Sequence, residues 1–136
     1  MMRLRLKYFL SPEEGISLVE FALILPVFLA LLLGMIDLGQ GFNTYIGMLN
    51  ATREGVIWLA NDPDNVAGMN TRITKELSRL GLTTSDMVIT RTPEKLAYDS
   101  GDIVTLTLEY HYPLTFGLIT KIPTLTLHTE YTMRVQ

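Results

Sequence analysis

The sequence predicts an α+β protein, in which a long N-terminal helix packs on a small antiparallel β-sheet and one short additional helix completes the fold. Two observations predict this class. An uncharged apolar run near the N-terminus leads into a segment with helical periodicity, whereas the last third of the chain alternates between apolar and polar residues. A chain of 136 residues suits one domain of ordinary size, so both patterns are expected to share one core.

Composition excludes several classes of protein. Hydrophobic residues make up 48% of the chain and charged residues 18%, which argues against disorder and indicates that some apolar surface meets lipid. Without cysteine there is no disulfide, thiolate zinc site, iron–sulfur cluster or cysteine nucleophile. The net charge of -3 provides no basic field for nucleic acid. We therefore expect neither a cofactor nor a nucleic-acid partner.

The apolar run is long enough to cross a membrane. Phe21 to Ile36 carries no charge, and Ile16 to Val19 extends the run beyond one acid, Glu20. As a helix, residues 16–36 would reach about 30 Å, the thickness of a hydrocarbon core. We therefore divide the chain into a basic leader (1–15), a transmembrane helix (16–36) and an extracytoplasmic α+β head (37–136).

Basic residues predict the orientation of this span. Arg3, Arg5 and Lys7 precede it, and no Lys or Arg lies between Asp37 and Thr52 after it. By the positive-inside tendency, the N-terminus lies in the cytoplasm and the head lies outside. A removable secretory signal is the competing interpretation, but the run is longer than a usual signal core and no small-x-small site ends it. We expect a single-pass protein of the cytoplasmic membrane.

The segment from Asp37 to about Ala60 is expected to continue as a helix with two stripes. The first is a row of small side chains, for which helix packing is the expected role: Asn43, Gly47, Ala51 and Gly55. The second is bulkier and suited to lie on a sheet: Tyr45, Leu49, Thr52, Val56 and Leu59. Each glycine weakens an isolated helix by up to about 1 kcal/mol, so this segment should depend on its neighbours.

Turn residues and alternation define the rest of the head. The sequence Asn61-Asp62-Pro63-Asp64-Asn65 should end the first helix, a second helix is predicted over Asn70–Leu80, and Gly81 should cap it. Three strands follow: Met87–Thr92, Asp102–Tyr112 and Thr124–Val135. Their one-sided alternation predicts an antiparallel sheet with one solvated face and the long helix on the other. The apolar loop Pro113–Pro123, with Phe116, Leu118 and Ile119, either touches the membrane or a partner, or folds onto the core.

Glu20 poses the main chemical question, since it lies inside the apolar run, five residues after Gly15. An unpaired carboxylate in a membrane costs several kcal/mol. If the chain is cut after Gly15, Ile16 gains a free ammonium, and Glu20 of a neighbouring copy can pair with it. The alternative is that Glu20, near the end of the span, reaches the cytoplasmic interface and is merely tolerated.

These residues also carry a resemblance. Gly15-Ile-Ser-Leu-Val-Glu20 resembles the type IV prepilin processing site, where a membrane peptidase cuts after the glycine. The longer block from Gly15 to Phe28, with Leu33–Gly39, closely resembles the TadE-like pseudopilins of tight-adherence (Tad, or Flp) pilus systems. Ala51-Thr52-Arg53-Glu54-Gly55 resembles the Ala-Arg-Glu-Gly motif of that family, with Thr52 in place of the commoner alanine. The ending Tyr131–Val135 resembles its C-terminal strand.

The resemblance implies a minor pilin or assembly component of a Tad pilus. Its implied partners are the prepilin peptidase, other Tad pilins, the Tad inner-membrane assembly platform and the lipid bilayer. Ile16 departs from the phenylalanine common at the first mature position of type IV pilins, and the segment after the span is longer than in the small major Flp pilins, which favours an accessory subunit. The alternative is an uncleaved bitopic anchor whose head binds another envelope or secretion protein.

Two further residues of the span are assigned to assembly together with Glu20. Phe21 begins the uncharged run, and Pro26 lacks the N–H group that would continue the helical hydrogen bonds. Pro26 is expected to kink or loosen the helix, either as a static bend or as a weak point that adjusts when the helix moves from lipid into a filament. Asp37 closes the apolar run at the expected outer interface.

An enzymatic function has little support in the sequence. His111 and His128 lie on the polar side of predicted strands, near Glu109 and Glu130, which is the one arrangement that a metal site would use. Such residues more often form a solvated face. No GxSxG, Walker A, HExxH or dinucleotide-binding glycine pattern is present. We expect the protein to be the substrate of an enzyme, the prepilin peptidase, and not an enzyme itself.

Overall fold

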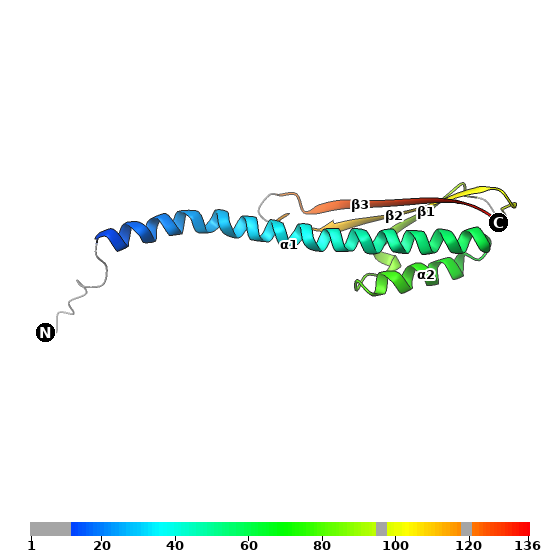
Figure 1. Ribbon diagram of the computed structural model, residues 1–136, viewed down its shortest axis with the longest axis horizontal. Helices are drawn as coiled ribbons and strands as arrows, with labels where there is room; N and C mark the ends of the chain where they lie inside the picture. Colours follow the sequence, from blue (N-terminus) through cyan, green and yellow to red (C-terminus); the bar gives the residue numbers. More distant parts are fainter. Residues whose placement is uncertain (1–11, 95–97, 118–120) are drawn as a thin grey trace.

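The computed structural model describes residues 12–94, 98–117 and 121–136. Figure 1 shows one long helix, α1 (Pro12–Asn61), whose C-terminal half carries the sheet and the second helix, whereas its N-terminal half extends away from them. The predicted α+β class is confirmed. The basic residues of the leader, Arg3, Arg5 and Lys7, lie outside the described residues, as do Leu118 and Ile119 of the apolar loop.

Helix α1 joins the predicted span and the predicted amphipathic segment into a single element of 50 residues. At 1.5 Å per residue it is about 75 Å long. It continues through Pro26 without a break, and Figure 1 shows a gentle curve over this half. The helix ends at Asn61, where the predicted turn with Pro63 begins.

Helix α2 (Val66–Ser78) begins four residues before its predicted start at Asn70. The prediction was wrong because Asn65 caps the helix: its side chain accepts a hydrogen bond from the N–H of Gly68 at 2.8 Å. The C-terminal end was predicted better. Leu82 N–H bonds to Leu77 O and Gly81 N–H bonds to Ser78 O, both at 3.1 Å, with Gly81 at φ +72. This is a Schellman motif, in which glycine is favoured.

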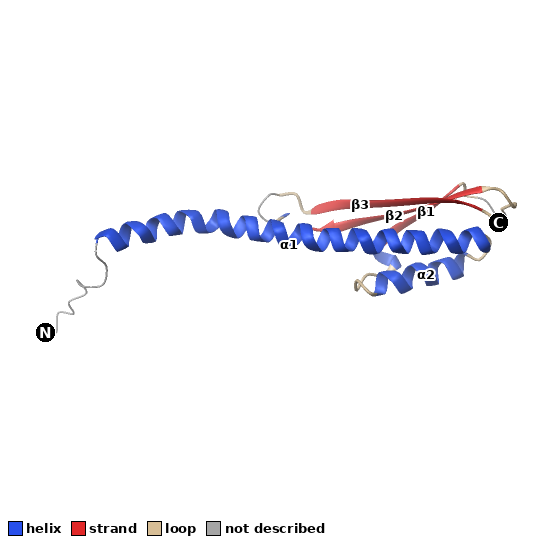
Figure 2. Ribbon diagram, in the orientation of Figure 1, coloured by secondary structure: helices blue, strands red, loops and turns tan. Residues whose placement is uncertain are grey.

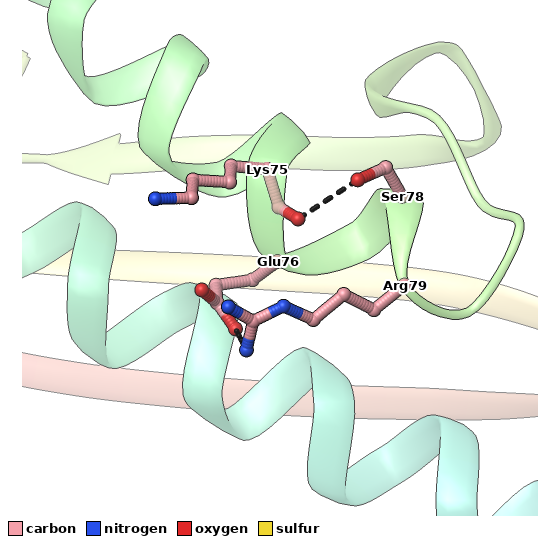
Figure 3. A network of polar contacts seen from close by, with 4 residues as sticks. All are labelled: Lys75, Glu76, Ser78 and Arg79. Carbon is pink, nitrogen blue, oxygen red and sulfur yellow. Dashed lines mark hydrogen bonds and ion pairs between the residues drawn. The ribbon is translucent and has the colours of Figure 1, made fainter.

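At the end of α2, Lys75 and Arg79 face solvent, whereas Glu76 is half-buried. Figure 3 shows the guanidinium of Arg79 pairing with Glu76 at 2.9 Å, while the Lys75 side chain points elsewhere and its carbonyl accepts from Ser78 at 2.8 Å. The Arg79 side chain is 67% exposed, so this pair contributes at most about 0.5 kcal/mol. The stability of α2 therefore comes from its other face, where Met69, Ile73 and Leu77 are buried.

The sheet has three antiparallel strands in the order β1-β2-β3: β1 (Met87–Thr92), β2 (Ile103–Pro113) and β3 (Thr124–Arg134). A short 3-10 turn, Thr84–Asp86, leads into β1. Each strand boundary lies within one residue of its prediction. Figure 2 shows the helices gathered on one face of the sheet, which leaves the opposite face open to solvent, as expected.

The core lies between the sheet and the two helices. Alternate residues of β2 are fully buried: Val104, Leu106 and Leu108. They belong to one cluster with Met48, Val56 and Leu59 of α1 and with the buried residues of α2. Strand β3 departs from its predicted pattern, because its core-side residues Leu125 and Tyr131 are 44% and 39% exposed. This strand is at the edge of the sheet.

Candidate assembly helix and its junction with the head

The expected processing site lies at the start of α1. Gly15 and Ile16 follow Pro12 within the first turns, and a side chain added at Gly15 would meet nothing within 4 Å. From Gly15 on, where burial is described, the first buried residue of α1 is Asp37, at 3% exposed. A cut between Gly15 and Ile16 would therefore take only residues 12–15 from the described helix and would leave the packing of the head intact.

Glu20 lies on an otherwise apolar and exposed surface. Residues 16–29 are all exposed, including Phe21 at 64% and Leu23 at 78%. Among the residues that the structure describes, none forms a hydrogen bond or an ion pair with Glu20. Ile16 and Glu20 are four residues apart in one helix, so they share a face one turn apart. The carboxylate and the expected new N-terminus thus lie on the same stripe.

The small-residue row of α1 is used inside the head. Ala51 is fully buried and Gly55 is buried. A side chain at Gly47 would overlap Leu80, which follows α2, and one at Gly55 would overlap Leu106 of β2 and the α2 side chain of Ile73. The helix that approaches this row is therefore α2 of the same chain, which requires the row to stay small.

Thr52 and Thr129 form a buried polar contact that the sequence analysis missed. Thr52 Oγ1 donates to the carbonyl of Met48 at 2.8 Å and lies 2.7 Å from Thr129 Oγ1. Because the Thr52 proton is used, Thr129 is the donor between the two hydroxyls. Thr129 is 2% exposed and lies between Leu127 and Tyr131 on the core side of β3. Strict alternation along this strand would therefore have predicted that Thr129 faces the core.

Asp37 is the second residue whose role the sequence did not reveal. Its two carboxylate oxygens accept the backbone N–H groups of Thr115 at 3.1 Å and of Phe116 at 2.6 Å. These bonds, led by the one from Phe116, lower the pKa of Asp37, although burial opposes them. Nearby, burial and the negative charge of Asp37 raise the pKa of Tyr112, whose hydroxyl lies 3.3 Å from Gln40.

This contact places the described start of the apolar loop on the head. The start of the loop is tied to α1 at the point where the apolar run ends, and Leu114 N–H bonds to Pro123 O at 3.0 Å to close its base. The described part of the loop is therefore folded onto the head beside Asp37. Its position is the end of the head nearest the expected membrane.

The strand histidines form a solvated polar face. His111 Nε2 lies 3.9 Å from Glu109 and His128 Nε2 lies 3.7 Å from Glu130, with all four side chains at least 39% exposed. Within residues 12–94, 98–117 and 121–136, no three His, Asp or Glu residues gather in a way that could hold a metal ion.

Comparison with known protein families identifies a similarity in the N-terminal part of the chain. The family model described as TadE-like protein matches residues 15–56. That range contains the expected processing site, the whole apolar run, Asp37 and the small-residue row. No curated protein and no solved structure matches the chain. Within the described residues, one helix is long and apolar enough to cross a membrane, and its most apolar stretch is not buried by the head. Over residues 15–56 this chain is therefore similar to TadE-like proteins, and the same segment contains most of the helix that is long and apolar enough to cross a membrane.

Proposed function

We propose that this protein is a minor pilin of a Tad pilus, which a prepilin peptidase cuts after Gly15 and which enters the filament through residues 16–36. One observation carries the proposal: in a TadE-like segment, a single acid lies on an exposed, otherwise apolar helix with no partner among the described residues. Such a surface is suited first to lipid and then to the equivalent helices of other pilins.

Cleavage supplies the missing cation. Removing residues 1–15 leaves the ammonium of Ile16 on the same helical stripe as Glu20. A neighbouring helix that is displaced by about 6 Å along the axis, one turn and a little more, brings its Ile16 level with Glu20. Helix association in lipid has little hydrophobic driving force of its own. The ion pair between Ile16 and Glu20 therefore supplies stability that apolar contact does not. Phe21 and Pro26 border this contact, and Pro26 allows the helix to adjust to its neighbours.

In this proposal the protein resides in the cytoplasmic membrane until assembly. The N-terminus faces the cytoplasm, where the peptidase and the assembly platform act on it, and the head is displayed outside. The protein is a substrate and a structural subunit, not a catalyst.

Intact mass and N-terminal sequencing test the processing step. Protein from the membrane of piliated cells should begin at Ile16, and Gly15→Leu should accumulate as the longer precursor. Gly34→Leu, a change at another glycine with open space around it, should be processed normally. A full-length protein that begins at Met1 in purified pili would overturn processing.

Replacing the acid tests the assembly step. Glu20→Ala should insert into the membrane normally but appear much less in sheared pili. Glu54→Ala, an exposed acid of the same helix within the head, is the matched control and should be incorporated normally. Equal recovery of both variants in pili would contradict the pairing mechanism.

An uncleaved anchor is the second candidate, and one observation favours it. The bond between Gly15 and Ile16 lies inside α1, which begins at Pro12, so a peptidase must unwind the first turn to reach it. In that case the head binds an envelope or secretion protein from a fixed position. Normal pili in cells whose only copy is Gly15→Leu, with the precursor intact, would decide for the anchor.

A further inference from the structure

We propose that the base of the head is a second membrane-contacting surface, which lies in the outer interface of the bilayer and is covered by phospholipid. This interfacial collar consists of five residues from α1, the described ends of the apolar loop, and β3: Leu38, Phe42, Leu114, Ile122 and Leu125. The inference depends on the proposed membrane span, because it takes the depth of the collar from the position of that span.

Asp37 fixes the depth of the loop. It directly follows the last residue of the span, and the N–H of Phe116 lies 2.6 Å from its carboxylate. Whatever depth Asp37 has, the start of the loop shares it. Figure 1 shows that β2 ends and β3 begins at the end of the head that faces the N-terminal half of α1. If residues 16–36 fill the hydrocarbon core, these strand ends lie at its outer surface.

The polar interface of the bilayer is thick enough to contain the two collar residues of α1. The polar region of one leaflet is about 5 to 8 Å thick. Leu38 and Phe42 lie about 1.5 and 7.5 Å beyond Asp37 along the helix axis. Leu38 is therefore near the boundary with the acyl chains, and Phe42 is at the outer edge of the head-group region.

The exposed apolar side chains of the collar indicate that lipid covers it. Leu38 and Phe42 are 70% and 67% exposed, and Ile122 is 59% exposed. An apolar groove of about 390 Å³ runs between α1 and β3, and its lining combines Leu38, Phe42, Leu114 and Leu125 with these residues: Asp37, Gly41, Tyr45 and Leu127. Met35, Leu38 and Phe42 are exposed at positions that share one face of α1, so the exposed apolar surface of the span continues along the helix to this groove and the lipid that solvates the span extends over it.

The polar groups at the collar are compatible with this position. Asp37 is 3% exposed as a residue, and its carboxylate already accepts two backbone hydrogen bonds, so placing it at the interface leaves no bare charge in lipid. Lys121 is exposed next to Ile122, where its ammonium can reach lipid phosphate. With two contacts on the bilayer, α1 and the collar, the head has a fixed rotation about the helix axis before it enters a filament.

The absence of cysteine allows a direct measurement of depth. The full-length Ile122→Cys variant is labelled with a fluorophore at its single cysteine. It is then reconstituted at a low protein-to-lipid ratio in phosphatidylethanolamine–phosphatidylglycerol vesicles. Quenching by nitroxides attached to lipid head groups or acyl chains reports the depth of the label. Leu29→Cys marks the span. Val88→Cys is the matched control, because Val88 is 57% exposed, close to the 59% of Ile122, but lies opposite Glu109, about 13 Å along β2 from Pro113.

The expected result is strong quenching of the label at 29 by acyl-chain nitroxides and of the label at 122 by head-group nitroxides, several-fold above that at 88. If 29 is quenched and 122 behaves like 88, the span stands and the collar is overturned. If 29 is not quenched, the proposed span itself fails. If the label at 122 becomes shielded only as the protein-to-lipid ratio rises, a second copy covers the collar and lipid does not, which also overturns the inference.

Discussion

The two halves of α1 are one continuous helix in opposite environments. Apart from Glu20, residues 16–36 carry no charge on any side, and none of them is buried within this chain. Beyond Asp37 the helix has stripes, with Met48, Ala51 and Val56 fully buried and Arg53 and Glu54 exposed. A helix that is apolar on all sides is stable when lipid surrounds it, whereas a helix with one apolar stripe needs a protein partner against that stripe.

The comparison shows that the two halves are held in place by different forces. The second half is stabilised by burial of apolar area in water, which needs no specific charge. In the first half, exchanging lipid for another apolar helix has little hydrophobic driving force, so the proposed pairing of Glu20 would direct its association. Substitutions in one half should therefore leave the behaviour of the other unchanged.

Removing a core side chain should separate the two halves most clearly. Leu106→Ala should lower the free energy of unfolding of the head by about 2 to 5 kcal/mol, because Leu106 is fully buried between the helices and the sheet. Leu29→Ala, in the exposed half, should leave it unchanged. Denaturant titration in detergent micelles, followed by fluorescence of the single Trp58 in the head, measures both. A large effect of Leu29→Ala would show that the halves fold as one unit.

The buried hydroxyl pair gives the next largest effect. Thr52→Ala should cost about 1 to 3 kcal/mol, because Thr129 then has a buried hydroxyl without its acceptor. In a double-mutant cycle, Thr52→Val with Thr129→Val should be less destabilising than the sum of the two single changes, since no unpaired group is left. Additive single effects would contradict the hydrogen bond.

A methyl group added to either half tests the close approach of α2. Gly55→Ala should destabilise the head by about 1 kcal/mol, because crowding against Leu106 and Ile73 exceeds the gain in helix propensity. Gly34→Ala meets nothing within 4 Å and should leave head unfolding unchanged. The same Trp58 titration compares them. A stabilising Gly55→Ala would mean that the α2 contact is looser than described.

The smallest effect is local and occurs at the boundary between the halves. The folded-state pKa of Asp37 is lowered, so its contribution is complete above the ordinary carboxyl value of 3.8 and is lost as pH falls through the lowered value. Hydrogen exchange at the amides of Thr115 and Phe116, corrected for the intrinsic rate, should therefore lose protection at acid pH. Asp37→Asn should abolish that pH dependence.

Asp86 provides a matched control for the acid effect at Asp37. The pKa of Asp86 is also lowered, by its hydrogen bond from the backbone of Thr83, but it lies in the turn before β1. Asp86→Asn should leave the pH dependence at Phe116 intact. If both variants abolish it, the acid transition belongs to the whole head and not to the contact at Asp37.

The accuracy of the sequence predictions depended on how local each signal was. The three strands were predicted to within one residue, because alternation is a property of neighbours along the chain. The start of α2 was missed by four residues, since the helical stripe began at Asn70 while the cap was the side chain of Asn65. The processing site, Glu20 and Pro26 were all found on a helix, yet their roles in assembly stay predictions, because they concern other chains.

By itself, the sequence determined the apolar span, the position of its one acid, the element order and the solvated face of the sheet, because each follows from periodicity or composition within a few residues. Only the tertiary structure decided that Asp37 holds the apolar loop and that Thr52 meets Thr129, contacts that join residues 78 or 79 and 77 positions apart. A buried polar group chooses its partner by position in space, and that position exists only after the helices have packed on the sheet.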